Sequence, residues 1–161
     1  MRNLSLLLIC LSTAIYCHAQ NTELKYYDPT ADASKDIELA LLKASSDNKN
    51  VLLQIGGNWC KWCRLYDKWS HATPQIDSLI NVNYIVVHVN FSPENKNPKL
   101  MNRLGYPQRF GFPVIVILDS KGARIHTQNT SYLEENDGYS EKKVAEFLSQ
   151  WSTKALSGEN Y

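Results

Sequence analysis

Two cysteines separated by two residues, Cys60 and Cys63, are the side chains of this sequence best suited to chemistry. They follow an apolar run at 51–55 with the pattern of a buried strand, and they precede residues 64–69, which have the pattern of a helix. A cysteine at a helix N-terminus lies near unpaired backbone N–H groups and the positive end of the helix dipole, and both favour a thiolate. The sequence therefore predicts thiol–disulfide exchange, in which Cys60 attacks a disulfide and Cys63 resolves the mixed disulfide.

Neighbouring side chains are expected to tune the two thiols. Lys61, Arg64 and Lys68 place positive charge near Cys60, which favours its thiolate. Trp62 lies between the cysteines, and we include it with Lys61 among the tuning residues. The sequence gives no direction for the effect of Trp62.

Other uses of a cysteine pair fit this sequence less well. Zinc needs four ligands, and no second cysteine pair exists, so His71, His88 and His126 would have to be brought together by folding. Haem attachment needs a histidine directly after the second cysteine, where Arg64 stands. A purely structural disulfide at this spacing closes too small a loop to stabilise a fold much. We therefore predict redox chemistry without a metal or other cofactor.

The first 19 residues have the pattern of a secretory signal peptide. A basic start precedes an apolar stretch, and the small residue Ala19 stands before the expected cleavage site. The apolar stretch is too short for a stable transmembrane helix, although a retained signal anchor is an alternative. Cleavage removes Cys10 and Cys17 and leaves Cys60 and Cys63. We expect a periplasmic or secreted protein that has no stable membrane insertion after cleavage.

Length and composition indicate one ordinary globular domain at 20–161. The chain has 161 residues, of which 43% are hydrophobic and 20% charged. Its 17 basic and 16 acidic residues nearly balance, so nothing in the charge favours nucleic acid as a partner.

Apolar periodicity predicts the elements before the cysteines. Residues 20–33 form a polar leading segment, with a short edge strand near 24–27 and no residue of chemical interest. Ser34 is expected to cap a helix over 35–47. This helix should face the sheet with Ile37, Ala40, Leu41 and Ala44.

The helix that begins at the cysteines should run to about Ala72, with Leu65 and Trp69 on the same buried face as Ala72. Residues 84–91 are apolar on both faces, as expected of a central strand covered by helices. His88 within that strand is expected to be a hydrogen-bonded sheet residue.

Two further elements complete the predicted sheet and its cover. Residues 114–118 and 122–128 have the pattern of a hairpin, with Gly122 free to take positive φ in the turn. Ser140 is expected to cap a last helix that closes the second face. The apolar face of that helix comprises Val144, Phe147, Leu148, Trp151 and Ala155.

Two motifs carry a resemblance to the thioredoxin superfamily. The run from Asn58 to Cys63 resembles extracytoplasmic thioredoxin-like proteins related to the reducing domain of DsbD, and Phe112-Pro113 before an apolar run is similar to the superfamily's cis-proline segment. The resemblance implies an α/β thioredoxin fold, with a central mixed sheet and helices on both faces. It also implies a cis bond at Pro113 and a substrate backbone that docks on Trp59, Phe112 and Pro113.

The aromatic side chains of the loop at 106–112 have two open interpretations. Tyr106, Phe110 and Phe112 either line the groove beside the cysteines that receives an extended substrate segment, or fill the core of their own loop.

The resemblance also draws attention to Gln54. Many thioredoxins carry a buried acid six residues before the first cysteine, which assists proton transfer at the second cysteine, and Gln54 occupies that position here. A neutral amide cannot take a proton, so deprotonation of Cys63 would be slower or would use water or another base, such as Asp67. The alternative is that Gln54 is simply a hydrogen-bonded core residue.

We therefore expect an exported thiol–disulfide oxidoreductase that reduces or isomerises disulfides of envelope or secreted proteins, with electrons from a membrane donor of the DsbD type. Two alternatives stay open. Stabilisation of the Cys60 thiolate by Lys61, Arg64 and the helix dipole gives a more oxidising couple, as in a disulfide-donating oxidase. A non-catalytic module would instead use the aromatic groove to hold peptides.

Overall fold

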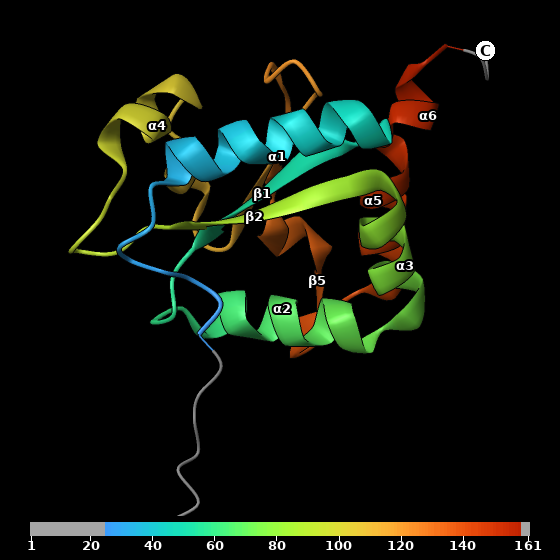
Figure 1. Ribbon diagram of the computed structural model, residues 1–161. Coiled ribbons are helices and arrows are strands. Elements are labelled where there is room, and N and C mark those ends of the chain that lie inside the picture. The colour runs from blue at the N-terminus through green and yellow to red at the C-terminus, as the bar shows by residue number, and fades with distance from the viewer. Residues whose placement is uncertain (1–24, 159–161) are drawn as a thin grey trace, which may run out of the picture.

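A mixed sheet of four strands forms the centre of the fold (Figure 1). The strands are β1 Asn50–Gly56, β2 Tyr84–Asn90, β3 Val114–Leu118 and β4 Arg124–Asn129, in the order β2-β1-β3-β4. β1 runs parallel to β2 and antiparallel to β3, and β3 runs antiparallel to β4. Helices cover both faces, so the predicted α/β architecture is confirmed.

The computed structural model describes residues 25–158. The predicted signal peptide at 1–19, with Cys10 and Cys17, lies outside these residues, as does the start of the predicted edge strand at 24–27. The part of that strand within the described range is wrong, because residues 25–28 form no strand. Within 25–158, none of the helices combines the length and the apolar character that crossing a bilayer requires.

The strand predicted at 84–91 is confirmed as β2, but its predicted central position is wrong. β2 lies at an edge of the sheet and pairs with β1 alone among the described strands. Its side chains are apolar on both faces because α1 packs on one face and α3 on the other. The central strands are β1 and β3, whose residues are buried throughout.

The first face of the sheet is covered by α1 Ala33–Asp47 and α4 Pro98–Arg103. The Asp32 carboxylate caps α1 and accepts hydrogen bonds from the backbone N–H groups of Ser34 at 3.0 Å and Lys35 at 3.2 Å. The predicted cap Ser34 is therefore wrong, because one carboxylate satisfies two free N–H groups. The predicted buried face is confirmed at Ile37, Ala40 and Ala44, and Leu41 is partly buried.

The second face carries α2 Lys61–Ala72, which begins directly after Cys60. Leu65 and Trp69 are partly buried as predicted, but Ala72 is exposed, so that part of the predicted face is wrong. The fully buried side chains of α2 are Cys63, Tyr66, Asp67 and Ser70. Two of these four are polar, which a search for apolar periodicity cannot detect.

α3 Pro74–Asn83 and α5 Glu141–Gln150 lie together on this second face. α5 begins after Ser140, although the Ser140 side chain makes no capping hydrogen bond. The helix ends at Gln150, so the predicted apolar face does not continue to Ala155. Ala155 lies in a separate short helix, α6 Thr153–Leu156.

The segment between the β3–β4 hairpin and α5 contains three further short elements. Gly122 turns the β3–β4 hairpin with φ +84°, as expected. A 3₁₀ helix, η2 Thr130–Leu133, and a small hairpin of β5 Glu134–Glu135 and β6 Gly138–Tyr139 follow. This hairpin brings the ring of Tyr139 into the hydrophobic core on the second face of the sheet, beneath α2, α3 and α5.

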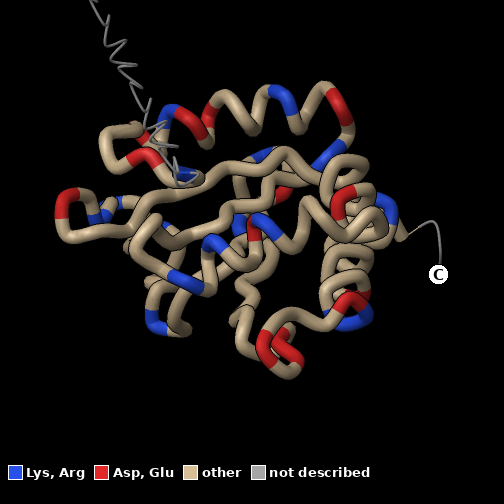
Figure 2. The backbone as a smooth tube through the Cα atoms, turned by 90° about the horizontal axis from the view of Figure 1, so that it is seen from below, with Lys and Arg blue, Asp and Glu red and all other residues tan. Residues whose placement is uncertain are grey.

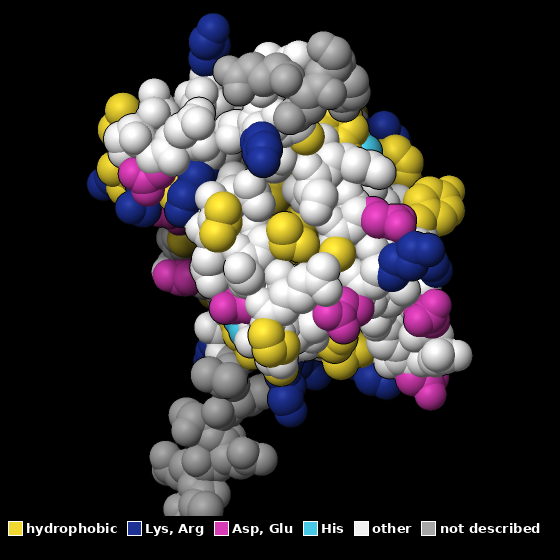
Figure 3. All heavy atoms as spheres, turned by 90° about the vertical axis from the view of Figure 1, so that its right-hand side faces the viewer, with side chains coloured by type: hydrophobic (Ala, Val, Ile, Leu, Met, Phe, Trp, Pro, Cys, Tyr) yellow, Lys and Arg dark blue, Asp and Glu magenta, His cyan; other side chains and the backbone are white. Residues whose placement is uncertain are grey.

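The surface of the described chain shows no segregation of charge. Lys and Arg are interspersed with Asp and Glu along the backbone (Figure 2). On the side of the molecule that carries α3, α5 and α6, hydrophobic side chains are mostly separated by polar and backbone atoms (Figure 3).

Two buried tyrosines differ in how their hydroxyl groups are satisfied. The Tyr66 hydroxyl has no hydrogen-bond partner within the described chain, whereas the Tyr84 hydroxyl donates to the Leu148 carbonyl at 2.6 Å. Burial raises the pKa of both hydroxyls. A buried polar group without a partner costs about 1–3 kcal/mol.

We expect Tyr66→Phe to raise the free energy of unfolding by about 1 kcal/mol, because it removes an unsatisfied hydroxyl. Tyr84→Phe, the matched control, should lower it by about 1 kcal/mol, because it leaves a buried carbonyl unpaired. Urea denaturation measures both. Equal destabilisation by the two substitutions would contradict this difference.

Candidate active site

Cys60 and Cys63 form a disulfide at the N-terminus of α2. Cys60 is the N-cap residue, with extended φ −85° and ψ 111°, and its Sγ accepts a hydrogen bond from the Cys63 N–H at 3.1 Å. Such N–H groups stabilise a thiolate once the disulfide is reduced. Cys60 is 5% exposed and Cys63 0%, so Cys60 is the sulfur that a partner can reach first.

Gly56, the last residue of β1, leaves room for the resolving sulfur. A Cβ at this position would lie 2.5 Å from Cys63 Sγ and 3.1 Å from the Tyr27 hydroxyl oxygen. The Gly56 carbonyl also accepts a hydrogen bond from the Phe91 N–H at 2.6 Å, which fixes the backbone there. Neither the sulfur nor the backbone can move away freely.

We therefore expect Gly56→Ala to lower the free energy of unfolding of the oxidised protein by about 1–3 kcal/mol through overpacking. Gly138→Ala is the control, because a Cβ at Gly138 meets no heavy atom within 4 Å. Denaturation of both oxidised variants measures the difference. A Gly56→Ala protein as stable as Gly138→Ala would show that Cys63 does not need this space.

The leading segment folds onto the active site, which the sequence did not predict. The Tyr27 N–H donates to Asn58 Oδ1 at 3.2 Å, and Asn58 Nδ2 donates to the Tyr27 carbonyl at 2.6 Å. The Arg64 guanidinium holds the other side of this loop by donating to the Asn58 carbonyl. Tyr27 itself is 1% exposed and packs with Cys60 and Cys63. No local pattern could have indicated this, because the contacting residues are far apart in the sequence.

A buried polar network lies behind Cys63. Gln54 Nε2 donates to the Tyr27 hydroxyl at 2.8 Å and to Asp67 Oδ2 at 2.7 Å, and His88 Nε2 lies 2.6 Å from Asp67 Oδ1. The predictions of Gln54 as a hydrogen-bonded core residue and of His88 as a hydrogen-bonded sheet residue are confirmed. The structure also places Gln54 in hydrogen-bond contact with Asp67, the residue that the sequence suggests as an alternative base.

Burial, and then the nearby Asp67 carboxylate, raise the pKa of the Tyr27 hydroxyl well above its ordinary value. Tyr27 is therefore neutral at physiological pH. It can accept a hydrogen bond from Gln54 while its own hydrogen stays available in the space beside Cys63.

An aromatic groove opens next to Cys60. Trp59 is 56% exposed, its indole N–H donates to the Phe91 carbonyl at 2.9 Å, and its ring meets Phe112 edge-on at 5.4 Å. Phe91 and Phe112 rings lie 5.1 Å apart. The groove has a volume of about 660 Å³, and its remaining lining residues are Ser92, Pro93, Glu94 and Lys96.

Of the three loop aromatics, Phe112 alone lines this groove. The Tyr106 hydroxyl accepts a hydrogen bond from Asn102 Nδ2 at 2.6 Å, and Phe110 lies beneath the Arg109 guanidinium at 4.2 Å. The prediction of a groove lined by Tyr106 and Phe110 is therefore wrong. These two rings belong to the surface around the 3₁₀ helix η1 Pro107–Phe110.

The Phe112–Pro113 peptide bond is cis, as predicted. Pro113 is buried directly before β3, and its carbonyl accepts a hydrogen bond from the Thr130 hydroxyl. Phe112 packs against the cluster of Tyr27, Cys60 and Cys63. The segment thus lies beside the disulfide, where a docking role is geometrically possible.

The remaining predicted tuning residues differ in position. Lys61 is exposed on the first turn of α2. Trp62 is partly buried, and its ring packs edge-on against that of Tyr139 with the centroids 5.8 Å apart. It therefore contacts both the disulfide cluster and the hydrophobic core on the second face of the sheet.

The three histidines considered for zinc lie in separate environments. His71 pairs with Asp77 at 2.8 Å, His88 with Asp67, and the His126 ring stacks on Trp151 at 4.2 Å. Within residues 25–158, no group of three or more His, Cys, Asp or Glu side chains could hold a metal ion.

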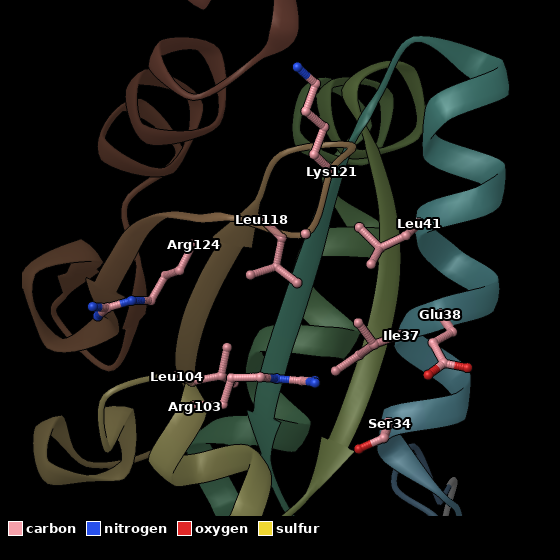
Figure 4. A pocket seen from close by; sticks show the side chains of 10 residues that line it. Ser34, Ile37, Glu38, Leu41, Arg103, Leu104, Leu118, Lys121 and Arg124 are labelled. Atoms are coloured by element: carbon pink, nitrogen blue, oxygen red, sulfur yellow. The ribbon is translucent and has the colours of Figure 1, made fainter.

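A second cavity lies on the first face of the sheet, between α1, α4 and the β3–β4 turn (Figure 4). Its volume is about 240 Å³. Ile37, Leu41 and Leu118 extend into it, whereas Lys121 points outward from the turn (Figure 4). None of the residues that line it belongs to the disulfide region.

Comparison with known proteins agrees with this geometry. A protein family described as thioredoxin-like matches residues 32–120. The thiol:disulfide interchange protein DsbD of Photorhabdus laumondii is 28% identical over 90 residues, which are 55% of this chain and 15% of that protein. The chain thus spans a small part of the length of this curated relative.

Two solved structures have the same fold. The disulphide isomerase of Xylella fastidiosa Temecula1 has a TM-score of 0.68 at 29% identity, covering 78% of this chain and 95% of that one. The oxidised C-terminal domain of Neisseria meningitidis DsbD has a TM-score of 0.53 at 17% identity, covering 74% of this chain and 96% of that one. The latter likeness is evidence of fold alone.

Proposed function

This chain belongs to the thioredoxin-like family, and we propose that it is a thiol–disulfide oxidoreductase that reduces or isomerises disulfides in exported proteins. The observation that carries the proposal is the disulfide at the start of α2, in which Cys60 is the N-cap and Cys63 is fully buried. The likeness to a disulphide isomerase at 29% identity supports the same chemistry.

The difference in exposure between the two cysteines supports a distinct role for each. In the reduced protein, the Cys60 thiolate attacks a substrate disulfide, one substrate sulfur leaves as a thiolate, and a mixed disulfide forms. Cys63 then attacks Cys60 Sγ, which re-forms the Cys60–Cys63 disulfide and releases the second substrate sulfur. Two electrons pass from the protein to the substrate. In isomerisation, another substrate thiol attacks the mixed disulfide instead.

A reductase of this kind needs a source of electrons outside the domain. We propose a membrane donor of the DsbD type, on the basis of the similarity to DsbD. Export to the periplasm or beyond is part of the same proposal and rests on the leader pattern at 1–19. Mass determination of the protein recovered from the envelope tests both the cleavage and the location. Recovery of uncleaved protein from the cytoplasm would contradict them.

The aromatic groove beside Cys60 is the proposed docking site for the substrate chain. Trp59 supplies exposed apolar area, the partly buried Phe112 lines the same groove, and the Phe112–Pro113 segment borders the disulfide. A strand of substrate can pair with the backbone of this segment while an apolar side chain enters the groove.

We expect Trp59→Ala to raise KM for a peptide disulfide about tenfold, which corresponds to about 1.4 kcal/mol of lost binding. Its rate with a small disulfide that does not reach the groove should be nearly unchanged. Tyr132→Ala removes another exposed aromatic side chain, outside the groove, and is the control. Equal KM values for the two variants would argue against docking at Trp59.

The position of Cys60 also favours one alternative direction. Because the helix N-terminus stabilises the Cys60 thiolate, it favours the reduced form and a more oxidising couple, as in an oxidase. The two directions are separated by adding the reduced protein to insulin disulfides and the oxidised protein to a reduced, unfolded substrate. We expect the reduced protein to reduce insulin rapidly and the oxidised protein to transfer few disulfides to the unfolded substrate. Disulfide donation alone would favour the oxidase.

The third candidate, a peptide-binding module without catalysis, makes a different prediction. The double Cys60→Ser, Cys63→Ser variant would retain full function in cells if binding were sufficient. We expect this variant to fold, to bind peptides in the groove and to lose function.

A further inference from the structure

One edge of the sheet, strand β2, is open along most of its length. Within residues 25–158, β2 pairs with β1 on one side and with no strand on the other. The leading segment passes only the far end of the strand, where Asn95 Nδ2, in the loop after β2, donates to the Pro29 carbonyl at 3.1 Å. The rest of the outer edge therefore has no strand partner in the described part of the chain.

The backbone groups that face outward from β2 can be assigned. The Phe91 N–H, directly after β2, donates to the Gly56 carbonyl of β1 at 2.6 Å. Successive residues of a strand turn their N–H and C=O groups to opposite sides, so the odd-numbered residues of β2 face β1. Tyr84, Val86 and His88 present theirs to the open edge. A row of such groups is a template for a further strand.

No residue of β2 protects this edge against pairing. Its seven residues include no Lys, Arg, Asp, Glu or Pro, and its register with β1 continues without a shift from Tyr84 to Asn90. Proteins usually guard open edges with charges, prolines or bulges. The other edge strand, β4, begins with Arg124 and has a register shift against β3 next to Leu118. The unguarded edge is therefore that of β2.

A surface groove of about 410 Å³ runs along the open edge, between β2 and α1. Its apolar side chains include Leu39, which is 58% exposed, and Val86, which is 36% exposed. Lys43 in this groove also lies 3.1 Å from Asp47 of the same helix. We call it the edge groove, and its lining residues are Asp36, Leu39, Ala40 and Lys43 of α1 and residues 85–88 of β2.

We propose that the edge groove binds a second copy of this chain, and that the two β2 strands pair antiparallel about a two-fold axis at Val86. Each Val86 then exchanges both backbone hydrogen bonds with Val86 of the second copy. Tyr84 does the same with His88 of the second copy. The two four-stranded sheets become one continuous sheet. The inference goes beyond the proposed function and does not depend on it.

The charges of the edge groove favour a second copy over an unrelated peptide. Asp36, Leu39 and Lys43 lie on one flank of α1, because they are three and four residues apart. A two-fold axis reverses the direction of the helix, so Asp36 of each copy lies opposite Lys43 of the other. The two Leu39 side chains meet near the axis, and the two Val86 side chains form a β-branched cross-strand pair. The surface is thus complementary to itself.

This pairing leaves both active sites accessible. The aromatic groove beside Cys60 is lined by residues 59, 91–94, 96 and 112. None of these residues lines the edge groove. The reduction of a disulfide by one copy should therefore not require the other, and variants that break the pairing should keep their activity.

Sedimentation equilibrium of the purified protein tests the pairing. We expect the weight-average mass to rise towards twice that of one chain between about 1 µM and 1 mM, the range of weak self-association. Amide exchange measured by NMR locates the contact. The outward amides of Val86 and His88 should exchange more slowly at high concentration, whereas those of Val87 and Val89, which face β1, should not change.

Val86→Lys places two like charges side by side at the axis and should raise the dissociation constant of the dimer about 100-fold. Tyr132→Lys is the control, because it adds the same charge at an exposed aromatic residue beyond the other edge strand. It should leave the dissociation constant unchanged. Both variants should reduce insulin at the wild-type rate.

Charge reversal tests the two-fold arrangement. Asp36→Lys alone and Lys43→Asp alone should each raise the dissociation constant about fivefold, because every reversal acts twice in a symmetric pair. An equal mixture of the two variants should associate as tightly as the wild type, because unlike copies restore both Asp–Lys contacts. Glu38→Lys is the control and should have no effect, because Glu38 lines the cavity on the opposite flank of α1 (Figure 4).

Three results would overturn the inference. The first is a monomer at about 1 mM, whether β2 stays open or another part of the chain covers it. The second is a dimer that Val86→Lys leaves intact, and the third is a mixture that associates no more tightly than its two variants. If Val86→Lys does not fold, the mixture decides. Failure of the proposed function would leave the association measurements unchanged, because none of them uses the cysteines.

Discussion

Cys60→Ser is expected to abolish the reduction of insulin disulfides, leaving the rate at that of the uncatalysed mixture. A serine hydroxyl cannot exchange with a disulfide, and the remaining thiol, Cys63, is fully buried and cannot replace it. The rate of insulin precipitation in the presence of dithiothreitol measures the effect. Because the variant lacks a disulfide, the proper reference for its stability is the reduced wild-type protein.

Activity of Cys60→Ser above about a tenth of the wild-type rate would assign the attack to another group. The matched comparison is Ser70→Ala, which changes a buried hydroxyl elsewhere on α2 and should keep activity. A comparable loss in Ser70→Ala would mean that damage to the helix, and not loss of the nucleophile, explains the result.

Cys63→Ser is expected to trap substrates as stable mixed disulfides with Cys60. Attack still occurs, because Cys60 keeps its place at the helix N-terminus. Its sulfur still accepts a hydrogen bond from the backbone N–H of residue 63, which a serine retains. Resolution fails, because no thiol remains behind Cys60. Non-reducing gels of envelope extracts should show adducts that dithiothreitol releases.

The double serine variant is the control for this trapping and should form no adducts. Adducts in both variants would indicate capture through groups other than Cys60. Rapid turnover by Cys63→Ser without adducts would contradict the role of Cys63, because it would mean that an external thiol resolves every mixed disulfide.

The elements nearest the cysteines could be predicted because their signals are local. An apolar run and, after the cysteines, a helical pattern identified β1 and α2, and they placed Cys60 at the helix start. The β3–β4 hairpin followed from Gly122 and two strand patterns. In each case, neighbouring residues alone decide the backbone conformation.

The environment of Cys63 could not be predicted in this way. Tyr27 reaches the site through hydrogen bonds to Asn58, 31 residues away, and His88 meets Asp67 across 21 residues. Asp67 is a polar residue at a buried position of α2, which apolar periodicity does not indicate. Such contacts follow from how α2 packs against β1 and β2, and no short segment encodes them.

The position of β2 shows a related difficulty. Apolar side chains on both faces indicate helices above and below a strand, but they do not indicate whether a strand pairs on each side. β2 has helices on both faces and a neighbour on one side only within the described sheet. The same strand carries His88, which pairs with Asp67 and is partly exposed.

The reduction potential of the Cys60–Cys63 couple tests the central claim most directly. The purified domain would be equilibrated with a series of glutathione buffers, and its oxidised fraction measured by thiol alkylation and mass spectrometry. We expect a reversible two-electron couple between about −270 and −180 mV, the range of thioredoxin to protein disulfide isomerase. A potential below about −300 mV, as in structural disulfides, would contradict redox function, and a value near −120 mV would contradict the proposed direction.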